Sequence, residues 1–70
     1  MTHATIEIDG IEYSATVDGK AVTIYRDGSW LGKGRWDAAL SMIEDCAADL
    51  PESVYVALDA AIVAAMTRAA

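Results

Sequence analysis

Between residues 4 and 35 the chain alternates apolar and polar positions, and Asp-Gly pairs interrupt the alternation at regular intervals. The pairs stand at 9–10, 18–19 and 27–28, each nine residues after the last. Asp-Gly between alternating segments is a strong hairpin signal because both residues tolerate the positive φ of a tight two-residue turn. The pattern therefore predicts four antiparallel strands, near residues 4–8, 11–17, 20–26 and 29–35.

Two-residue turns at all three positions would fix the register of these strands. The expected cross-strand pairs are Ile8–Ile11, Ile6–Tyr13, Tyr13–Ile24 and Ile24–Leu31. Because the side-chain period of a strand is two, this register collects the apolar residues on one face, which we expect to be the core face. Its members are Ile6, Ile8, Ile11, Tyr13, Ala15, Val17, Val22, Ile24 and Leu31.

The opposite face of the predicted sheet is mostly polar, and it carries one aromatic pair. Tyr25 is expected opposite Trp30, with Gly32 and Gly34 next along the same strand. Such a pair can simply stabilise its hairpin, or it can anchor a protein partner. Both interpretations stay open. The polar members of this face are Glu7, Glu12, Ser14, Thr16 and Thr23.

Residues 37–50 fit an amphipathic helix that begins at Asp37 as its N-cap and ends at Leu50 before Pro51. A second helix is expected from Pro51 or Glu52 onward, and it is apolar on two sides. Asp59 is its only charge between residues 54 and 66. One stripe holds Tyr55, Leu58, Ile62, Ala65 and Ala69, and a second holds Val56, Ala60 and Val63.

A helix with apolar residues all round is buried on more than one side. The second stripe can therefore lie between the sheet and the first helix, or it can form a symmetric dimer interface through Val56 and Val63. The resulting prediction is one α+β domain over residues 1–70. A four-stranded antiparallel β-meander (1–36) is followed by two α-helices (37–70), both packed on one face of the sheet.

Charge is distributed unevenly over the 70 residues, whose net charge is −6. Residues 37–70 contain six acidic residues and only one base, Arg68. This negative charge argues against direct binding to nucleic acid. The single cysteine, Cys46, excludes an intrachain disulfide and fits a reducing compartment, and the N-terminus shows no signal-peptide pattern, so we expect a cytoplasmic protein.

The sequence contains no set of residues that indicates a particular reaction. Residues 28–34 fail as a phosphate loop because the spacer is one residue short and no Ser or Thr follows Lys33. His3 is the only histidine, and Cys46 reads as a small core residue. Glu44 and Asp45 would diverge by about 100° on a helix and face water. We therefore predict no enzymatic activity, no cofactor and no metal site.

The predicted first helix carries the feature with the clearest functional meaning, an acidic outer face. Its carboxylates recur at one and two helical turns, about 6 and 11 Å apart, and duplex phosphates also present regularly repeated negative charge. We expect this face to bind a basic surface of a protein partner, with Tyr25 and Trp30 as secondary contacts; the alternative is a solvated face. The acidic residues concerned are Asp37, Glu44, Asp45, Asp49 and Glu52.

In size, acidity and predicted α+β build, the chain resembles the small counter-defence proteins of phages and mobile elements, anti-CRISPR proteins above all. Many proteins of this kind bind a host nucleoprotein complex, and some imitate nucleic acid. The resemblance implies an inhibitor that acts in the cytoplasm of a bacterial host cell. The alternative from a different class is a homodimeric adaptor or antitoxin-like module that uses the hydrophobic second helix.

Overall fold

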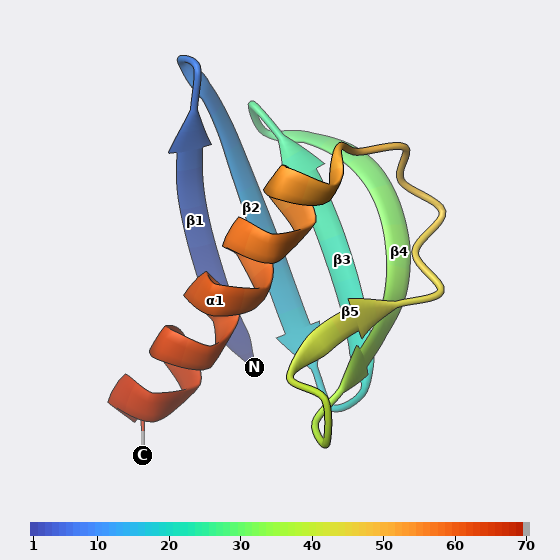
Figure 1. The fold of residues 1–70 in the computed structure, drawn as a ribbon, viewed down its shortest axis with the longest axis vertical. Helices are drawn as coiled ribbons and strands as arrows, with labels where there is room; N and C mark the ends of the chain where they lie inside the picture. Colours follow the sequence, from blue (N-terminus) through green and yellow to red (C-terminus); the bar gives the residue numbers. More distant parts are fainter. Residues whose placement is uncertain (70) are drawn as a thin grey trace.

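Over residues 1–69, the part of the chain that the computed structural model describes, five antiparallel strands precede one C-terminal helix (Figure 1). The strands pair in chain order, so the sheet is a simple meander. The side chain of Ala69, expected on the inner stripe of the helix, lies outside the described part. The elements are β1 (Thr2–Ile8), β2 (Ile11–Asp18), β3 (Ala21–Arg26), β4 (Ser29–Asp37), β5 (Met42–Glu44) and α1 (Glu52–Ala69).

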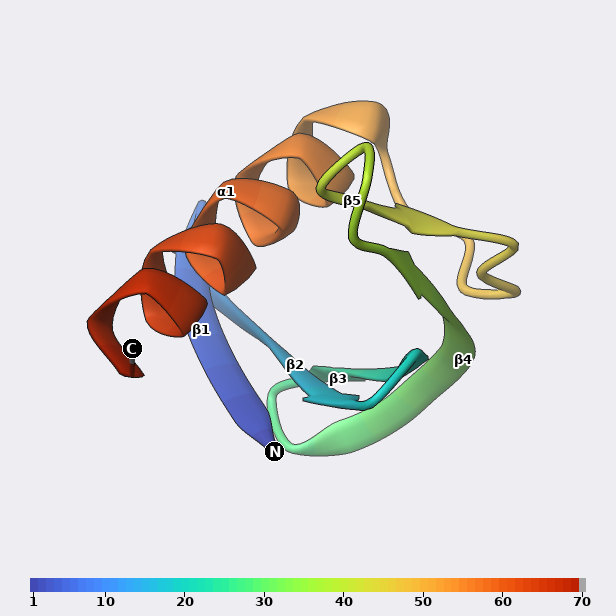
Figure 2. The same ribbon diagram turned by 90° about the horizontal axis from the view of Figure 1, so that it is seen from below.

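The sheet curls so that its two edge strands, β1 and β5, come to lie on either side of α1 (Figure 2). Leu58 and Ile62 of α1 are fully buried in the same core cluster as Val22 and Ile24 of the sheet. The predicted core face is confirmed, since each of its nine residues is buried or packs half-buried against the core cluster. The helix thus closes the open side of a half-barrel.

The first hairpin has the predicted register, and the second does not. Ile8 pairs with Ile11 through a two-residue turn at Asp9 and Gly10, both with positive φ. The second turn uses Gly19 and Lys20 instead of residues 18–19, because Asp18 still belongs to β2 and pairs with Ala21. The expected Tyr13–Ile24 pair is therefore wrong. Tyr13 lies opposite Arg26, and this shift of two residues leaves every side chain on its predicted face.

The third hairpin contains a β-bulge. Tyr25 lies opposite Trp30 as predicted, but the register shifts between Ile24 and Tyr25, so Ile24 faces Gly32 instead of Leu31. The extra residue reverses the facing of the rest of β4. Gly32 and Gly34, expected on the polar face, therefore line the core side of the sheet.

The predicted helix over residues 37–50 is wrong, and with it the fold class of four strands and two helices. Asp37 does act as a cap: its Oδ1 accepts hydrogen bonds from the backbone N–H of Ala39 and of Leu40, at 2.9 and 3.0 Å. Ser41 then adopts a positive φ of 54° and reverses the chain. The following residues form β5, in which Ile43 pairs with Trp36 of β4. The capping residue therefore closes a hairpin turn instead of starting a helix.

After β5, residues 45–51 form an irregular segment, here called the strap, which follows the edge of β4 (Figure 1). The backbone N–H of Ala47 donates to the carbonyl of Lys33 at 3.4 Å. Ala48 is buried against Gly32, and Cys46 lies against Gly34. A Cβ at either glycine would overlap atoms of the strap. Glycine at both positions therefore allows the strap to lie this close to β4. Tertiary packing here overrides a helical pattern that is too short to be stable alone.

Helix α1 begins directly after Pro51, whose carbonyl accepts from the N–H groups of Val54 and Tyr55. Its inner stripe packs as predicted, with Leu58 and Ile62 fully buried. Its second stripe is not covered by a first helix, because residues 37–50 form the hairpin and the strap. Val56 is 59% exposed. No helix within residues 1–69 is long and apolar enough to cross a membrane.

Candidate functional site

The five predicted partner-binding acidic residues do not share a helix face, because they belong to β4, β5, the strap and the start of α1. Asp37 is half-buried and its carboxylate holds the β4–β5 turn. Arg35 Nη2 lies 3.6 Å from Glu44 Oε2 and 3.3 Å from Asp45 Oδ2, so the guanidinium partly neutralises both carboxylates. Regular spacing at helical intervals is therefore absent, and with it the geometric basis for imitating a duplex.

The remaining negative charge follows the strap to the start of α1. We call Glu44, Asp45, Asp49 and Glu52 the acidic edge; the last three are exposed. Because the strap runs beside β4, these carboxylates lie next to the strand that carries Lys33 and Arg35. The edge is therefore acidic with interspersed cations, which suits a partner surface of mixed charge with an excess of positive charge.

The aromatic pair Tyr25–Trp30 lies on the outer face of the sheet, opposite the side that α1 covers. Trp30 is 62% exposed, whereas Tyr25 is half-buried beside it. Trp36 does not belong to this group, because it is 5% exposed and part of the core on the other face. A large exposed indole beside a second aromatic ring is typical of the residues that anchor protein partners.

The aromatic pair and the strap lie on opposite faces of β4. Ala48 of the strap packs on Gly32 on the core side of the sheet, whereas Trp30, two residues before Gly32, is on the outer face with Tyr25. A partner that contacts both Trp30 and the carboxylates of the strap would therefore have to extend round β4 from one face to the other.

The side chains that could take part in catalysis or metal binding lie apart from one another in the described residues. His3 Nδ1 lies 3.1 Å from Thr16 Oγ1 on the exposed face of β1 and β2, and the described hydrogen bonds and ion pairs include no carboxylate at this histidine. Within residues 1–69, no three His, Cys, Asp or Glu side chains are close enough together to hold a metal ion. A surface hollow of about 300 Å³ is lined by Lys20, Arg35, Trp36, Asp37, Ala38 and Ala39.

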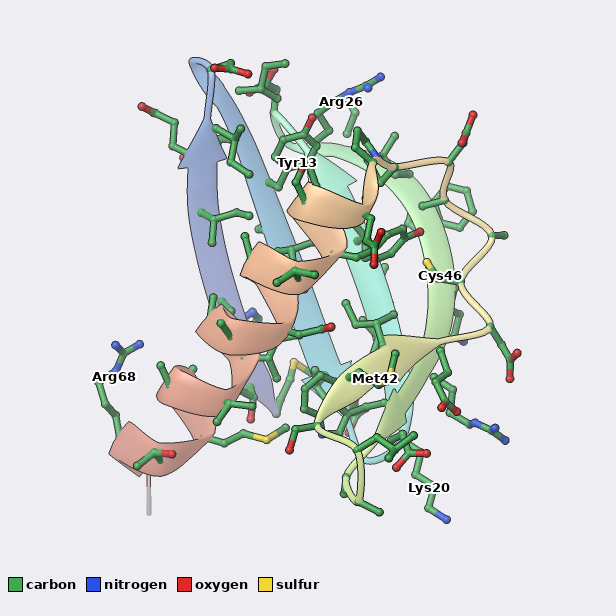
Figure 3. The ribbon with its side chains drawn as sticks, viewed as in Figure 1. Tyr13, Lys20, Arg26, Met42, Cys46 and Arg68 are labelled. Atoms are coloured by element: carbon green, nitrogen blue, oxygen red, sulfur yellow. The ribbon has the colours of Figure 1, made fainter. Side chains whose placement is uncertain are left out.

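A hydrogen bond from Tyr55, next to Cys46, holds the strap to α1. Figure 3 shows the Cys46 thiol on the strap beside β4. The Tyr55 hydroxyl donates a hydrogen bond to the carbonyl of Ala48. Burial raises the pKa of Tyr55, and the neighbouring Cys46 and Asp49 raise it further. The hydroxyl therefore stays protonated and serves as a donor that holds the acidic edge in place.

Replacing Tyr55 by phenylalanine is expected to destabilise the protein by about 1 kcal/mol, the usual net value of one hydrogen bond. The free energy of unfolding from urea titration measures this loss. Tyr25→Phe, which removes the same atom from the outer sheet face, is the matched control and should stay within about 0.5 kcal/mol of the wild type. Equal stability of both variants would show that the Tyr55 hydroxyl does not fasten the strap.

Asp59 has a structural role that the sequence analysis did not assign. Its Oδ1 accepts a hydrogen bond from the backbone N–H of Ile43 at 2.9 Å, which ties the middle of α1 to the free edge of β5. Burial raises the pKa of Asp59, although the bond from Ile43 lowers it in part. A signal was present in the sequence, because a lone acid in an apolar helix needs a partner.

Among the described residues, Trp30 and three carboxylates of the acidic edge are exposed, and the Tyr55 hydroxyl holds the strap. Comparison with protein-family models, with curated proteins and with solved structures found no match.

Proposed function

We propose that this protein is a non-enzymatic inhibitor that binds a basic, nucleic-acid-binding surface of a protein partner in the bacterial cytoplasm. The aromatic pair Tyr25–Trp30 is the anchor and the acidic edge provides the electrostatic attraction. The observation that carries the proposal is Trp30, which is 62% exposed on the outer sheet face opposite Tyr25. The order of importance differs from the sequence-based expectation, in which the acidic residues came first.

The aromatic pair supports the proposal because burial of an exposed indole is among the largest contributions to protein–protein affinity. Trp30 sits on a strand, next to Tyr25 across the sheet, so little conformational entropy is lost when a partner covers it. The surrounding outer face is polar: Ser14 lies opposite Tyr25 on β2, and Thr23, two residues before Tyr25 on β3, lies opposite Lys33. An apolar centre with a polar rim is the usual composition of such an interface.

The charge distribution supports a basic partner. The net charge is −6, and residues 37–70 contain six acidic residues against one base. Complementary charge raises the association rate, and salt weakens the effect because the Debye length falls from ~10 Å at 0.1 M to ~3 Å at 1 M. A partner surface that normally holds nucleic acid has the required positive charge.

The proposal predicts that Trp30→Ala lowers the affinity for the partner at least tenfold, mainly through faster dissociation. The partner is first captured with the wild-type chain from a host lysate, purified, and then titrated by surface plasmon resonance. Thr5→Ala, on the same outer face but on β1, is the control and should bind like the wild type. The free partner should bind nucleic acid, and the wild-type chain should displace it in a mobility-shift assay.

Charge is tested separately with Asp45→Asn, Asp49→Asn and Glu52→Gln combined. These changes keep side-chain size and should lower the association rate and its salt dependence. The control combines Glu7→Gln, Asp9→Asn and Asp18→Asn, which change the net charge equally on β1, on β2 and in the turn between them. If the Trp30 variant and the acidic-edge variant both bind like the wild type, the proposed surface is not the one that the partner contacts.

A homodimeric adaptor or antitoxin-like module is the second candidate. The observation that favours it is the apolar outer stripe of α1, on which Val56 is 59% exposed. This surface lies on the opposite side of the molecule from the aromatic pair. The two candidates therefore predict different sensitive residues: Trp30 for the inhibitor, and Val56 with Val63 for the adaptor.

A further inference from the structure

Two adjoining segments on the side of the molecule that faces the reader in Figure 1 are poor in charge. They are the outer stripe of α1 and, beside it, β5 with the 38–41 turn, which lie on the same side in Figure 2. We call the surface that they form the front face. Residues 38–43 contain no charge, and residues 53–67 contain only Asp59, whose carboxylate is bonded to Ile43. Its exposed large apolar side chains are Leu40, Met42, Val56 and Val63.

An exposed apolar surface of this extent on a chain of net charge −6 is a typical mark of an interface. The outer stripe of α1 runs through Val56, Ala60, Val63, Ala64 and Thr67, all exposed and all within about 100° of the helix circumference. The small alanines at its centre permit another helix to approach closely. Ala60 lies midway between Glu52 and Arg68, the charged residues at the two ends of the stripe.

We propose that the front face is the two-fold interface of a homodimer, in which two copies of α1 pack antiparallel with Ala60 at the axis. The two charged residues that flank the stripe select this orientation. An antiparallel pair brings Glu52 to the same end of the interface as Arg68 of the partner subunit, and opposes the two helix dipoles. A parallel pair would instead place two Glu52 side chains at one end. Figure 3 shows Arg68 pointing away from the sheet.

The same axis brings the two β5 strands together. The bond between Ile43 and Asp59 places the middle of β5 level with Ala60, one residue further along α1. A two-fold axis at Ala60 therefore brings the β5 and turn surfaces of both copies to the same side of the helix pair, where Leu40 and Met42 become covered. Leu40 is 62% exposed in the single chain. Such an interface is isologous, with the same patch on both subunits.

The front face is large enough for a specific dimer interface only if β5 takes part. A helix of 18 residues is about 27 Å long and about 10 Å wide, so α1 alone offers about 270 Å². The exposed side chains of β5 and its turn, chiefly Leu40 and Met42, must supply the rest to bring each copy to about 500 Å². The total of about 1,000 Å² reaches the lower limit for a specific protein–protein interface. A contact through α1 alone would not.

Light scattering over a dilution series tests the assembly. The wild-type chain should have twice the mass of 7.4 kDa and dissociate on dilution. Val56→Glu and Leu40→Glu, on different elements of the front face, should each shift the protein to 7.4 kDa while circular dichroism stays unchanged. Thr5→Glu, which adds the same charge to the outer sheet face, should not. A wild-type mass of 7.4 kDa at every concentration, or a dimer that survives both front-face changes, overturns the proposal.

Cross-linking tests the orientation. With Cys46→Ala removing the native thiol, Ala60→Cys should form a disulfide-linked dimer on oxidation, because the two positions meet at the axis. Ala64→Cys should not, because an antiparallel pair separates the two copies of this residue by about 12 Å along the helix axis. Cross-linking at both positions indicates a parallel pair, and cross-linking at neither indicates another surface; each result contradicts the proposed geometry.

Discussion

Replacing Gly34 by alanine is expected to destabilise the protein by about 3 kcal/mol, a large part of the stability of a 70-residue domain. A Cβ at this position would lie 2.8 Å from Cys46 Cβ, 2.9 Å from Cys46 Cα and 2.9 Å from the carbonyl oxygen of Glu44. Two of these three atoms belong to the backbone. The strap would therefore have to move away from β4, because no side-chain rotation relieves the overlap.

Movement of the strap would also disturb the elements at both of its ends. The β4–β5 pairing includes Arg35 opposite Glu44, directly beside Gly34. Gly32 has the same relation to the other part of the strap, because a Cβ there would lie 2.8 Å from Ala48 N. The double variant Gly32→Ala with Gly34→Ala is expected to leave β5 and the strap detached, while β1 to β3 keep their register.

Urea unfolding followed by circular dichroism measures the loss. Lys33→Ala is the matched control, since Lys33 lies between the two glycines but is exposed on the outer face. Its expected effect is within about 0.5 kcal/mol. A Gly34→Ala variant as stable as the Lys33→Ala variant would show that the strap does not pack against β4 in solution.

The first three strands follow from the sequence because local signals decide them. Alternation identifies the core face, and Asp9-Gly10 and Asp27-Gly28 have the positive φ values that a tight hairpin turn requires. The second turn is less predictable, because both Asp18-Gly19 and Gly19-Lys20 place a glycine where the chain reverses. The bulge at Ile24 is not visible in the pattern, since glycines at 32 and 34 fit either face.

The error over residues 37–50 has a different origin. Asp37 has the character of an N-cap, and the apolar residues that follow recur at helical spacing. The same residues also satisfy a turn and a short strand, and the choice depends on contacts distant in sequence: Ile43 with Trp36 and Asp59, and the strap with the β4 glycines. Local propensity is a weak guide where such contacts decide.

The candidate site could be predicted only in part for the same reason. The pairing of Tyr25 with Trp30 was available from the turn at Asp27-Gly28, and the structure confirms it. The carboxylates of Glu44 and Asp45 were placed on a helix face in water, because nothing local reveals that β5 brings both to Arg35. Residues on one hairpin can be placed from sequence, whereas residues on different elements need the fold.

At neutral pH, Asp59→Ala is expected to be less stable than Asp59→Asn by about 1–3 kcal/mol. Alanine leaves the backbone N–H of Ile43 without its acceptor, and an unsatisfied donor costs about this amount. Asparagine keeps an oxygen at the same place. Because both variants are uncharged at this position, their difference reports the hydrogen bond that closes the β5 edge, free of any effect of charge.

The effect of the Asp59 charge on stability is measured by comparing the free energy of unfolding of the wild type and of Asp59→Asn over a range of pH. Burial raises the pKa of Asp59 in the folded chain above its unfolded value, so the folded state binds the proton more tightly. The stabilisation that Asp59 contributes is then fully present below its pKa in the unfolded state, and it is lost as the pH rises through its pKa in the folded state. The other carboxylates titrate in both proteins and cancel in the difference. The stability of Asp59→Asn relative to the wild type should therefore increase from acidic to neutral pH. A difference that stays constant or decreases contradicts the raised pKa of Asp59. It also contradicts the burial of this carboxylate between α1 and β5.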